Sequence, residues 1–576
     1  MAARRYPPTR LSATLLVAAA LAGAVPACDS GWNAREREAV RAALEGIQAS
    51  AERAASAKEE AAPASFPEAA QGEVRLNLIE AIGLALANNQ DVQIVGYEPL
   101  RAEADLVEAR SVYDPAIVAS NTFGRSKRPT ASTLDTGVIA DTHLTEDTWE
   151  FSGGLRQRVP TGATFSITQQ MDYLDTNSRL VAPNPQYTSG LTFGISQPLL
   201  KDIGDPEAQA AIRIATLATG VSLQEFRRRV MGIVSEVTAA YWQLAFDRAV
   251  VAVHRESLQQ AREVLRREQV RAERGVSNEL NVARAASAVA SHQVQLVRAE
   301  NQAGDSADRI KRLLNTPGMP VWGEAEVVPA TQPRFFVIEV DRTAAMARAL
   351  THRPELVQAR SRIDMQRIRV DAADRQRLPR LDALLRYTLN GLGGNLGGAM
   401  DMQDFRDPVT WVAGLELEWP LGNRAARAEF QRRRVDYEQV LLEADRLTDE
   451  VLEEVSVAVR AVSRGRDEVE SSLQAQDAAQ EVLKGEQTRM ELQPMDRRTN
   501  EELLRAQSQL AQARQDHLVA LLKFNLALTE LARTQGTLLA EHGISLVWPE
   551  ETPSRRLEPV RVTGPENAQP LRINTD

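Results

Sequence analysis

Long stretches of this 576-residue chain carry an apolar residue at every third or fourth position, the spacing that places apolar side chains on one face of a helix. The two longest stretches have no internal proline, and at a rise of about 1.5 Å per residue each would span about 100 Å. Two shorter helices placed end to end would match one long helix, so we expect parallel columns of similar height. The predicted helices cover residues 78–112, 206–271, 278–314, 424–489 and 499–532.

Six shorter segments, within 115–198 and 382–420, instead carry an apolar residue at every second position, as half-buried β-strands do. Such strands, separated by turn-rich loops, are typical of a membrane β-barrel, and a soluble sandwich with one wet face is the alternative. Tryptophans within these segments resemble an interfacial girdle and favour the membrane interpretation. The girdle candidates are Trp149, Trp411 and Trp419. The candidates for the barrel lumen are Glu416 and Glu418, with periplasmic water as the alternative for both.

The N-terminus carries a predicted export signal. Arg4 and Arg5 precede an apolar stretch, residues 11–25, that is too short for a membrane span and fits a secretory signal. The stretch runs into Cys28, the only cysteine in the chain. Its sequence, Val25-Pro26-Ala27-Cys28, resembles a bacterial lipoprotein signal, which implies cleavage before Cys28 and acylation of that residue.

An ordinary signal with an incidental cysteine is the alternative to the lipoprotein interpretation. Two or three acyl chains on Cys28 would hold the protein firmly to a membrane. Asp29 resembles an inner-membrane retention signal of some enteric bacteria, so the choice of membrane stays open. After the signal no run of about 18 apolar residues remains, so a chain that spans a membrane would have to use strands.

Composition and motifs exclude several classes of protein. The net charge of -10 argues against a nucleic-acid-binding protein, which would need a basic face. The six histidines show no metal-ligand spacing, and no nucleophile elbow or zincin helix is present. The glycine cluster 391–398 lacks the Lys-Ser/Thr of a phosphate-binding loop. We therefore expect neither an enzyme nor a bound cofactor or metal.

The whole pattern occurs twice. Ala81, Leu86 and Pro115 recur at one constant offset, as Ala345, Leu350 and Pro379, without a gap. A duplication of this size indicates one architectural unit used twice. The predicted division is a lipoprotein signal peptide (1–27), a linker behind the anchor (28–73), a first repeat (74–316, strands about 115–198), an inter-repeat linker (317–341), a second repeat (342–539, strands about 382–420) and a C-terminal tail expected to be flexible (540–576).

Three short motifs are found along the chain: Leu78-Ile79-Glu80-Ala81-Ile82, Gln197-Pro198-Leu199-Leu200, and the turn Arg274-Gly275-Val276-Ser277 that leads to Asn281-Val282-Ala283. These motifs and their duplicated order resemble the TolC-like outer-membrane efflux protein family (outer membrane factors), over about residues 74–539. The second helical turn, 492–496, departs from the family because the expected glycine is absent.

The resemblance implies a mainly α fold with membrane β, in which the duplicated helix–strands–long helix–helix repeat builds a trimeric α-barrel plus a transmembrane β-barrel. Oligomerisation is also a physical requirement of membrane strands, because an open sheet edge in lipid leaves unpaired amides. The family typically supplies four strands per protomer, whereas six segments are present here. Either the first block carries an extra hairpin at Pro160-Thr161-Gly162, or two segments lie outside the membrane.

The resemblance also implies sites. Gate candidates at the periplasmic constriction are Glu502, Arg505 and Asn281; Arg505 would pair with Glu502 or widen the closed pore, and ordinary solvated helix residues are the alternative. Candidates for adaptor contact at the hairpin tips are Gly275, Val276, Ser277, Pro494 and Asp496, although Gly275 would equally serve as a plain turn glycine.

The predicted function is an outer-membrane channel that passively conducts substrates from the periplasm to the exterior. Its expected partners are two further copies of the chain, a periplasmic adaptor (membrane fusion) protein, an inner-membrane pump and outer-membrane lipid, with no nucleic acid. The expected location is the outer membrane, lipid-anchored and extending into the periplasm. Two alternatives stay open: a lipid-anchored periplasmic coiled-coil scaffold without a pore, and a channel for type I protein secretion.

Overall fold

The computed structural model describes residues 72–130, 132, 135–137, 142–275, 277–406, 408–492, 497–547 and 561–563, all of which lie in the unit Ala70–Asp576. The predicted signal peptide, Cys28 and almost all of the linker 28–73 lie outside the described residues. Val276, Pro494 and Asp496, three of the tip candidates, lie outside them as well.

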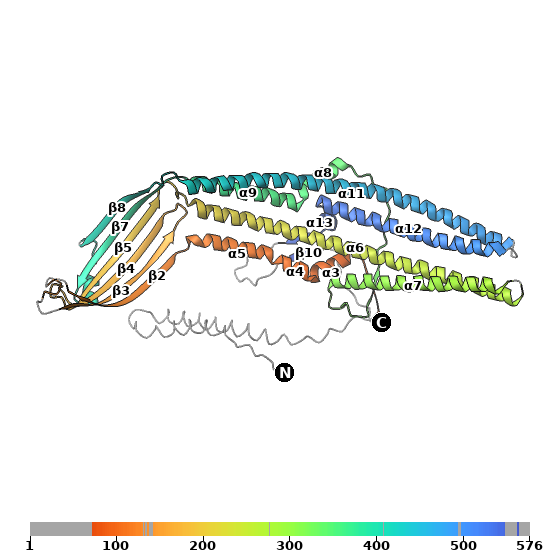
Figure 1. Ribbon diagram of the computed structural model, residues 1–576, viewed down its shortest axis with the longest axis horizontal. Helices are drawn as coiled ribbons and strands as arrows, with labels where there is room; N and C mark the ends of the chain where they lie inside the picture. Colours follow the sequence, from red (N-terminus) through yellow and green to blue (C-terminus); the bar gives the residue numbers. More distant parts are fainter. Residues whose placement is uncertain are drawn as a thin grey trace, which may run out of the picture. The chain divides into compact units, whose positions relative to one another are not determined.

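Two very long helices dominate the unit (Figure 1). They have 68 and 69 residues, close to the predicted 206–271 and 424–489, and so each rises about 100 Å. The remaining helices are shorter. The helices are α3 (Leu78–Asn88), α4 (Gln90–Gly96), α5 (Glu98–Arg110), α6 (Pro206–Glu273), α7 (Glu279–Leu314), α8 (Arg342–His352), α9 (Pro354–Arg375), α10 (Leu396–Asp401), α11 (Arg424–Leu492), α12 (Arg497–Gln535) and α13 (Leu538–Glu541).

The prediction of one helix over 78–112 was wrong, because the chain breaks it into α3, α4, α5 and a 3-10 turn (Ser111–Tyr113). Asn89 leaves the helical conformation, and its side-chain oxygen accepts hydrogen bonds from the amides of Asp91 and Val92. An asparagine cap of this kind starts a new helix. Pro99 then stands in the first turn of α5, where its missing amide hydrogen does no harm.

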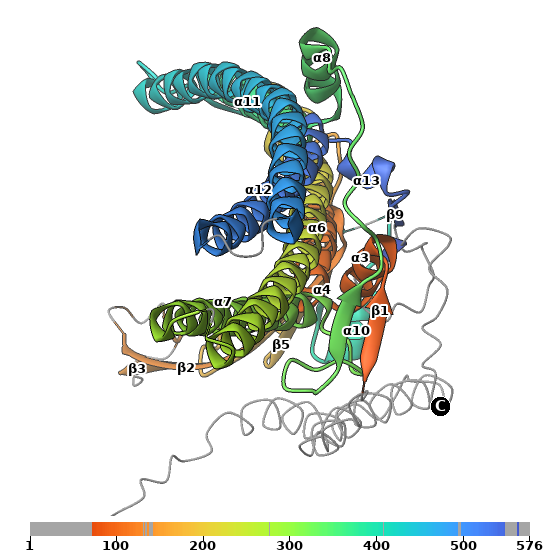
Figure 2. The ribbon, with the colours of Figure 1, turned by 90° about the vertical axis from the view of Figure 1, so that its right-hand side faces the viewer.

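The helices form a layer four columns wide. Helix α6 contacts α5 and α7 on one side and α9 and α12 on the other, and α11 contacts α9 and α12. In Figure 1, α5 and α7 follow one another beside α6, and α9 and α12 do the same beside α11. Figure 2, seen along the columns, shows this layer as a curve, with α3 and β1 (Glu73–Leu76) on one side of it. The expected pairing of two half-length helices with one long helix is therefore confirmed.

The largest core lies midway along the layer, where α3 packs against α6 and α7. Phe226, Tyr241 and Leu244 of α6 are fully buried there, each contributing about 1.5–3 kcal/mol to stability. The hydroxyl of Tyr241 donates to the carbonyl of Leu76 and accepts from the amide of Thr331, both at 2.9 Å. It thereby ties the parallel pair of β1 and β6 (Glu326–Pro329) to the long helix.

All six predicted strand segments form one antiparallel sheet, in the order β2-β3-β4-β5-β7-β8. The hairpin turn at Pro160-Thr161-Gly162 is present and joins β3 to β4, with Gly162 at a φ of 87°. Part of the expected C-terminal tail is also ordered, as the short pair of β9 (Ser545–Val547) and β10 (Arg561–Thr563). The sheet strands are β2 (Ala116–Pro129), β3 (His143–Arg158), β4 (Thr164–Thr176), β5 (Gln186–Pro198), β7 (Arg380–Gly393) and β8 (Val409–Glu418).

Candidate functional site

One face of the six-stranded sheet is apolar from edge to edge. Because neighbouring residues in register share a face, a single row of paired positions can be followed through all six strands. One such row holds an apolar or aromatic side chain in every strand. Many positions of the neighbouring rows on the same face are apolar as well. The row consists of Ile117, Leu155, Ile167, Phe193, Tyr387 and Trp411.

The opposite face is polar. The row next to the apolar one carries threonine in four neighbouring strands, and the hydroxyls of Thr192 and Thr388 lie 3.0 Å apart. Further along, Glu416 stands opposite Asp382, and Glu418 stands opposite Arg380. The two glutamates therefore lie on the face opposite to Trp411, as the alternation predicted. The four threonines are Thr168, Thr192, Thr388 and Thr410.

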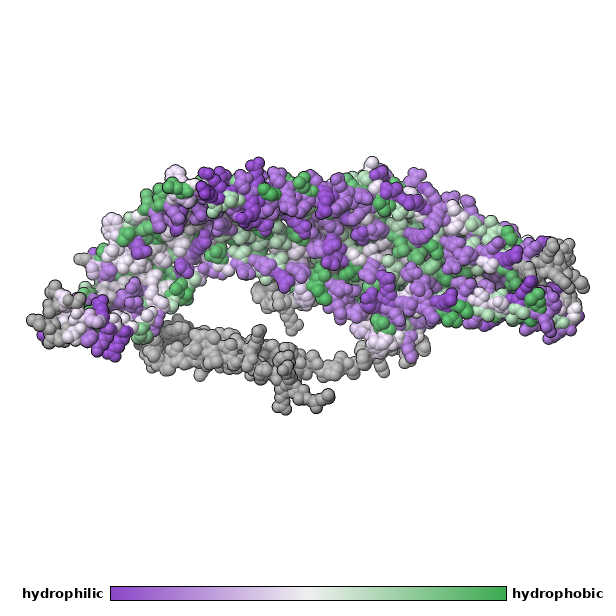
Figure 3. Space-filling view, in the orientation of Figure 1, coloured by the Kyte–Doolittle hydropathy of each residue, from purple (hydrophilic) through white to green (hydrophobic). Residues whose placement is uncertain are grey.

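The apolar face is largely uncovered by the described chain. Ile117 is 85% exposed, Phe123 75%, Leu415 72% and Trp411 69%. Hydrophobic residues are visible over the strands in the space-filling view (Figure 3). A soluble protein rarely exposes so continuous an apolar surface, so this face requires an apolar environment.

The three girdle candidates are aromatic and lie on or next to this face. Trp149 pairs with Phe123 in the sheet, and their rings stack with centroids 6.3 Å apart. The indole nitrogen of Trp149 donates a hydrogen bond to the side-chain oxygen of Asn121 at 2.5 Å. Trp419 directly follows β8 and is exposed. Each of these side chains combines an apolar ring with a polar N–H group, which suits a boundary between lipid and water.

The connection between β7 and β8 folds back onto the apolar face. Sequence reasoning missed this feature, because it interpreted the connection as a plain loop. The hydroxyl of Ser189 in β5 donates to the carbonyl of Ala399 in α10 at 2.7 Å. A Cβ at Gly391 would collide with the same carbonyl, so only glycine allows this approach. The glycine cluster 391–398 thus has a packing role, and Phe405 of the same connection lies 6.4 Å from Phe193 between ring centroids.

At the far end of the first helical hairpin, Gly275 ends α6 with a φ of 75°, a conformation that favours glycine. Ser277 turns back toward the helix, and its hydroxyl donates to the carboxylate of the buried Glu268 at 2.7 Å. The side-chain amide of Asn281 in turn donates to the hydroxyl of Ser277 at 3.3 Å. Ser277 and Asn281 therefore stabilise the turn itself, while Gly275 is exposed.

In the second helical hairpin, Glu502 of α12 accepts a hydrogen bond from Arg489 of α11 at 2.9 Å. Arg505, the partner considered from the sequence, is exposed one turn further along. Sequence reasoning missed Arg489, because the pair forms only once the two helices lie side by side. A small core next to it, with Val264, Leu483 and Leu503 among its members, joins α6, α11 and α12.

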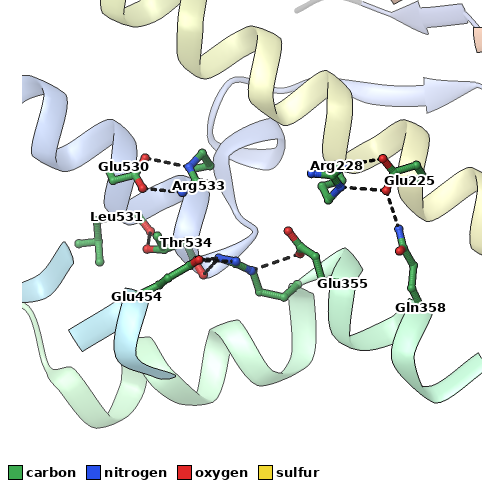
Figure 4. A network of polar contacts seen from close by, with 10 residues as sticks. Glu225, Arg228, Glu355, Gln358, Glu454, Glu530, Leu531, Arg533 and Thr534 are labelled. Atoms are coloured by element: carbon green, nitrogen blue, oxygen red, sulfur yellow. Dashed lines mark hydrogen bonds and ion pairs between the residues drawn. The ribbon is translucent and has the colours of Figure 1, made fainter. Parts of the chain in front are cut away.

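A buried arginine joins the helices of the second repeat, and Figure 4 shows its partners Glu355, Glu454 and Thr534. Arg353, whose side chain is only 5% exposed, stands between α8 and α9. Its guanidinium donates to Glu454 of α11 at 2.6 and 2.8 Å and to the carbonyl of Thr534 in α12 at 3.3 Å. It also forms an ion pair with Glu355 at 3.2 Å. The hydrogen bonds from Arg353 to Glu454 and Thr534 are charge-assisted, and such bonds are about twice as strong as neutral ones.

A second polar contact joins α6 to α9. The carboxylate of Glu225 accepts hydrogen bonds from Arg228 and from Gln358 of α9, the latter at 3.2 Å. Hydrogen bonds from Arg228, opposed by partial burial, lower the pKa of Glu225 to about 2. Figure 4 shows this group beside the contacts of Glu355 and Glu454.

Within the described part of the chain, no helix has the length and apolar character needed to cross a membrane. Among the same residues, no group of three or more His, Cys, Asp or Glu side chains is placed to hold a metal ion.

Comparison with solved structures shows a shared fold. The chain resembles the CmeC outer membrane channel of Campylobacter jejuni, with 15% identity, a TM-score of 0.59, and coverage of 80% of this chain and 86% of that one. It also resembles the outer membrane protein VceC of Vibrio cholerae, with 15% identity, a TM-score of 0.57, and coverage of 80% of this chain and 96% of that one. A third similar structure is the open state of the MtrE outer membrane channel of Neisseria gonorrhoeae, with 15% identity, a TM-score of 0.56, and coverage of 80% of this chain and 89% of that one.

No curated protein matches the sequence significantly. The family model described as outer membrane efflux protein matches residues 167–316 and 345–537, more than half of the chain and parts of both repeats. These segments include strands of the two-faced sheet and the long helices described above. The chain therefore belongs to the outer membrane efflux protein family.

Proposed function

We propose that three copies of this chain form a channel in the outer membrane that conducts substrates passively from the periplasm to the exterior, as one component of a tripartite efflux system. The observation that carries this proposal is the sheet with two unlike faces. Lipid would cover the apolar face with Ile117 and Trp411, and water in the pore would cover the polar face with Glu416 and Glu418. A soluble scaffold would have no use for such a sheet.

The open edges of the sheet support assembly. Strand β2 runs away from the helices and β8 runs back to them, so β8 of one copy can pair with β2 of the next in the antiparallel sense. In lipid, each backbone group left unpaired at these edges would cost several kcal/mol. Closure into a ring removes both edges, and the four helical columns of each copy would continue the same wall through the periplasm.

The proposed path begins at the tips of the helical hairpins, at the periplasmic end. Three copies of Glu502 around an axis would favour cations and disfavour anions. The pair of Glu502 with Arg489 would hold α11 and α12 together while the end is closed. We assign adaptor contact to the hairpin ends with Gly275, and anchoring to acylated Cys28. An inner-membrane pump would supply the energy.

Two neighbouring substitutions in β8 test the proposal. Leu415→Arg places a charge on the lipid-facing side, which destabilises a membrane strand by about 2–4 kcal/mol near the midplane. Glu416→Arg places the same charge on the pore-facing side. We expect Leu415→Arg to abolish heat-modifiable trimers in detergent and channels in planar bilayers. Glu416→Arg should assemble and shift ion selectivity toward anions. Equal tolerance of both substitutions, or the absence of channels in the unaltered protein, would overturn the proposal.

A further inference from the structure

The first repeat contains a hairpin that the second repeat lacks. The sheet strands β2 and β7 start at equivalent points, directly after Pro115 and Pro379, and each block ends before a long helix. Between these points the first repeat holds four strands and the second holds two. The inserted hairpin is β3 and β4, His143–Thr176.

The inserted hairpin is part of the continuous sheet. Strand β3 pairs with β2 from Arg156 to His143, and β4 pairs with β5 from Thr164 to Leu174. Its apolar side chains, among them Trp149 and Ile167, fall on the same face as those of β5 and β8. With 16 and 13 residues, both strands exceed the 9–11 residues that a tilted strand needs to cross a membrane.

We infer that all six strands of each copy line the membrane channel, so that three copies close a barrel of eighteen strands rather than twelve. This inference rests on the proposed function. Strands about 4.8 Å apart and tilted by about 40° each cover about 6.3 Å of circumference. Six strands then span about 38 Å, close to the width of four helical columns packed 8–10 Å apart.

The inferred barrel has a backbone diameter of about 36 Å, against about 24 Å for twelve strands. Side chains that extend about 5–6 Å inward from each wall leave an open bore of about 25 Å in the eighteen-strand barrel, compared with about 13 Å in a barrel of twelve strands. Barrels of 16–18 strands leave an aqueous channel of this class. The exit would therefore impose no size limit on small-molecule substrates, and selection by size would fall to the periplasmic end.

Thiol labelling tests whether the inserted hairpin lies in the channel wall. Single cysteines are placed on each face of the hairpin, Phe151→Cys and Ser152→Cys in β3, and on each face of β5, Phe193→Cys and Thr192→Cys. The protein in lipid vesicles is exposed to a membrane-impermeant maleimide, and the unaltered chain, with Cys28 alone, gives the background. We expect at least tenfold faster labelling at Ser152→Cys and Thr192→Cys than at Phe151→Cys and Phe193→Cys.

The outcomes separate the two proposals. Equal labelling of both β3 positions, with alternation preserved in β5, would place the hairpin outside the wall and overturn the eighteen-strand inference while keeping a channel. Loss of alternation in β5 as well would overturn the proposed function itself.

The bore is tested with neutral polymers added to the exterior side of channels in planar bilayers. A matched variant replaces residues 130–185 with a short turn, so that β2 leads directly into β5. We expect polymers of up to about 25 Å across to enter the unaltered channel, and the cut-off to fall about twofold in the variant. Equal cut-offs would overturn the inference, and the labelling result decides if the variant does not assemble.

Discussion

Arg353 donates two hydrogen bonds to the carboxylate of Glu454, at 2.8 and 2.6 Å, across the gap between α9 and α11. The same guanidinium reaches the carbonyl of Thr534 near the end of α12. In the first repeat the equivalent position is Asn89, which donates to the carbonyl of Leu313 near the end of α7 at 3.0 Å. In each repeat, the residue at the break between two short helices thus donates a hydrogen bond to the C-terminal end of a later helix, α7 in the first repeat and α12 in the second.

Replacement of Arg353 by methionine should destabilise the protein strongly. The substitution leaves the carboxylate of Glu355 without its counter-ion and the carbonyl of Thr534 without its charged donor. Breaking a buried ion pair costs about 3–5 kcal/mol. Because Glu454 is itself half exposed, we expect a loss of about 2–3 kcal/mol. The measurement is the midpoint of thermal unfolding, followed by helical circular dichroism. Arg360→Met, at an exposed position of α9, is the control, and an equal shift for both variants would contradict the assignment.

Replacement of Arg489 by alanine should make the periplasmic end open more often. The ion pair with Glu502 is partly exposed and is worth about 0–1 kcal/mol, so its loss would raise the open-to-closed ratio by up to about fivefold per pair. Single-channel recording measures the open fraction. Arg446→Ala removes an exposed pair within α11, with Glu450, and should leave gating unchanged. An unchanged open fraction in Arg489→Ala would argue against a gating role.

Gly391→Ala should release α10 from the sheet. The new Cβ would collide with the carbonyl of Ala399, and overpacking of this kind costs about 1–3 kcal/mol. We expect trypsin to cleave faster after the exposed Arg406 in the same connection. Gly397→Ala, where an added Cβ meets only ordinary contact, is the matched control. Identical cleavage rates in the two variants would show that the close approach does not hold the connection in place.

Acid should weaken the contact of Glu225 with Arg228 and α9. The folded pKa of Glu225 is about 2, below its ordinary value of 4.5. Its contribution to stability is therefore fully present above pH 4.5 and is lost as the pH falls from 4.5 toward 2. We expect Glu225→Gln to cost about 1–2 kcal/mol at pH 7, allowing for its partial exposure, and progressively less below pH 4.5. Melting midpoints at pH 7 and pH 3 measure this, with Glu263→Gln on the same helix as the control. A difference that does not change with pH would refute the assignment.

Much of the fold could be read from the chain because its largest elements obey simple periodicity. The lack of internal proline allowed the lengths of α6 and α11 to be predicted, and the alternation of apolar and polar residues allowed the two faces of the sheet to be predicted. The breaks at Asn89 and Tyr97 were harder to predict, because asparagine and tyrosine also occur inside helices and only local hydrogen bonds decide their role.

The contacts between distant elements could not be predicted in the same way. The pair of Arg489 with Glu502 depends on how two helices superpose after a turn, which spacing along the chain does not define. Arg353 gave no signal either, since arginine is usually a surface residue and its burial depends on partners more than 100 positions away. The glycine cluster 391–398 suggested a plain loop, whereas the missing side chain of Gly391 allows α10 to approach the sheet closely.

The pairing of β5 with β7 has a consequence for the history of the chain. This ladder, from Tyr187 opposite Gly393 to Pro198 opposite Asp382, is the seam between the two duplicated halves within the sheet. A half-length ancestor would have exposed the same backbone groups at that seam and satisfied them by pairing with another copy of itself. Fusion of two such genes would have turned a contact between subunits into an internal one, halving the number of chains needed for a closed ring.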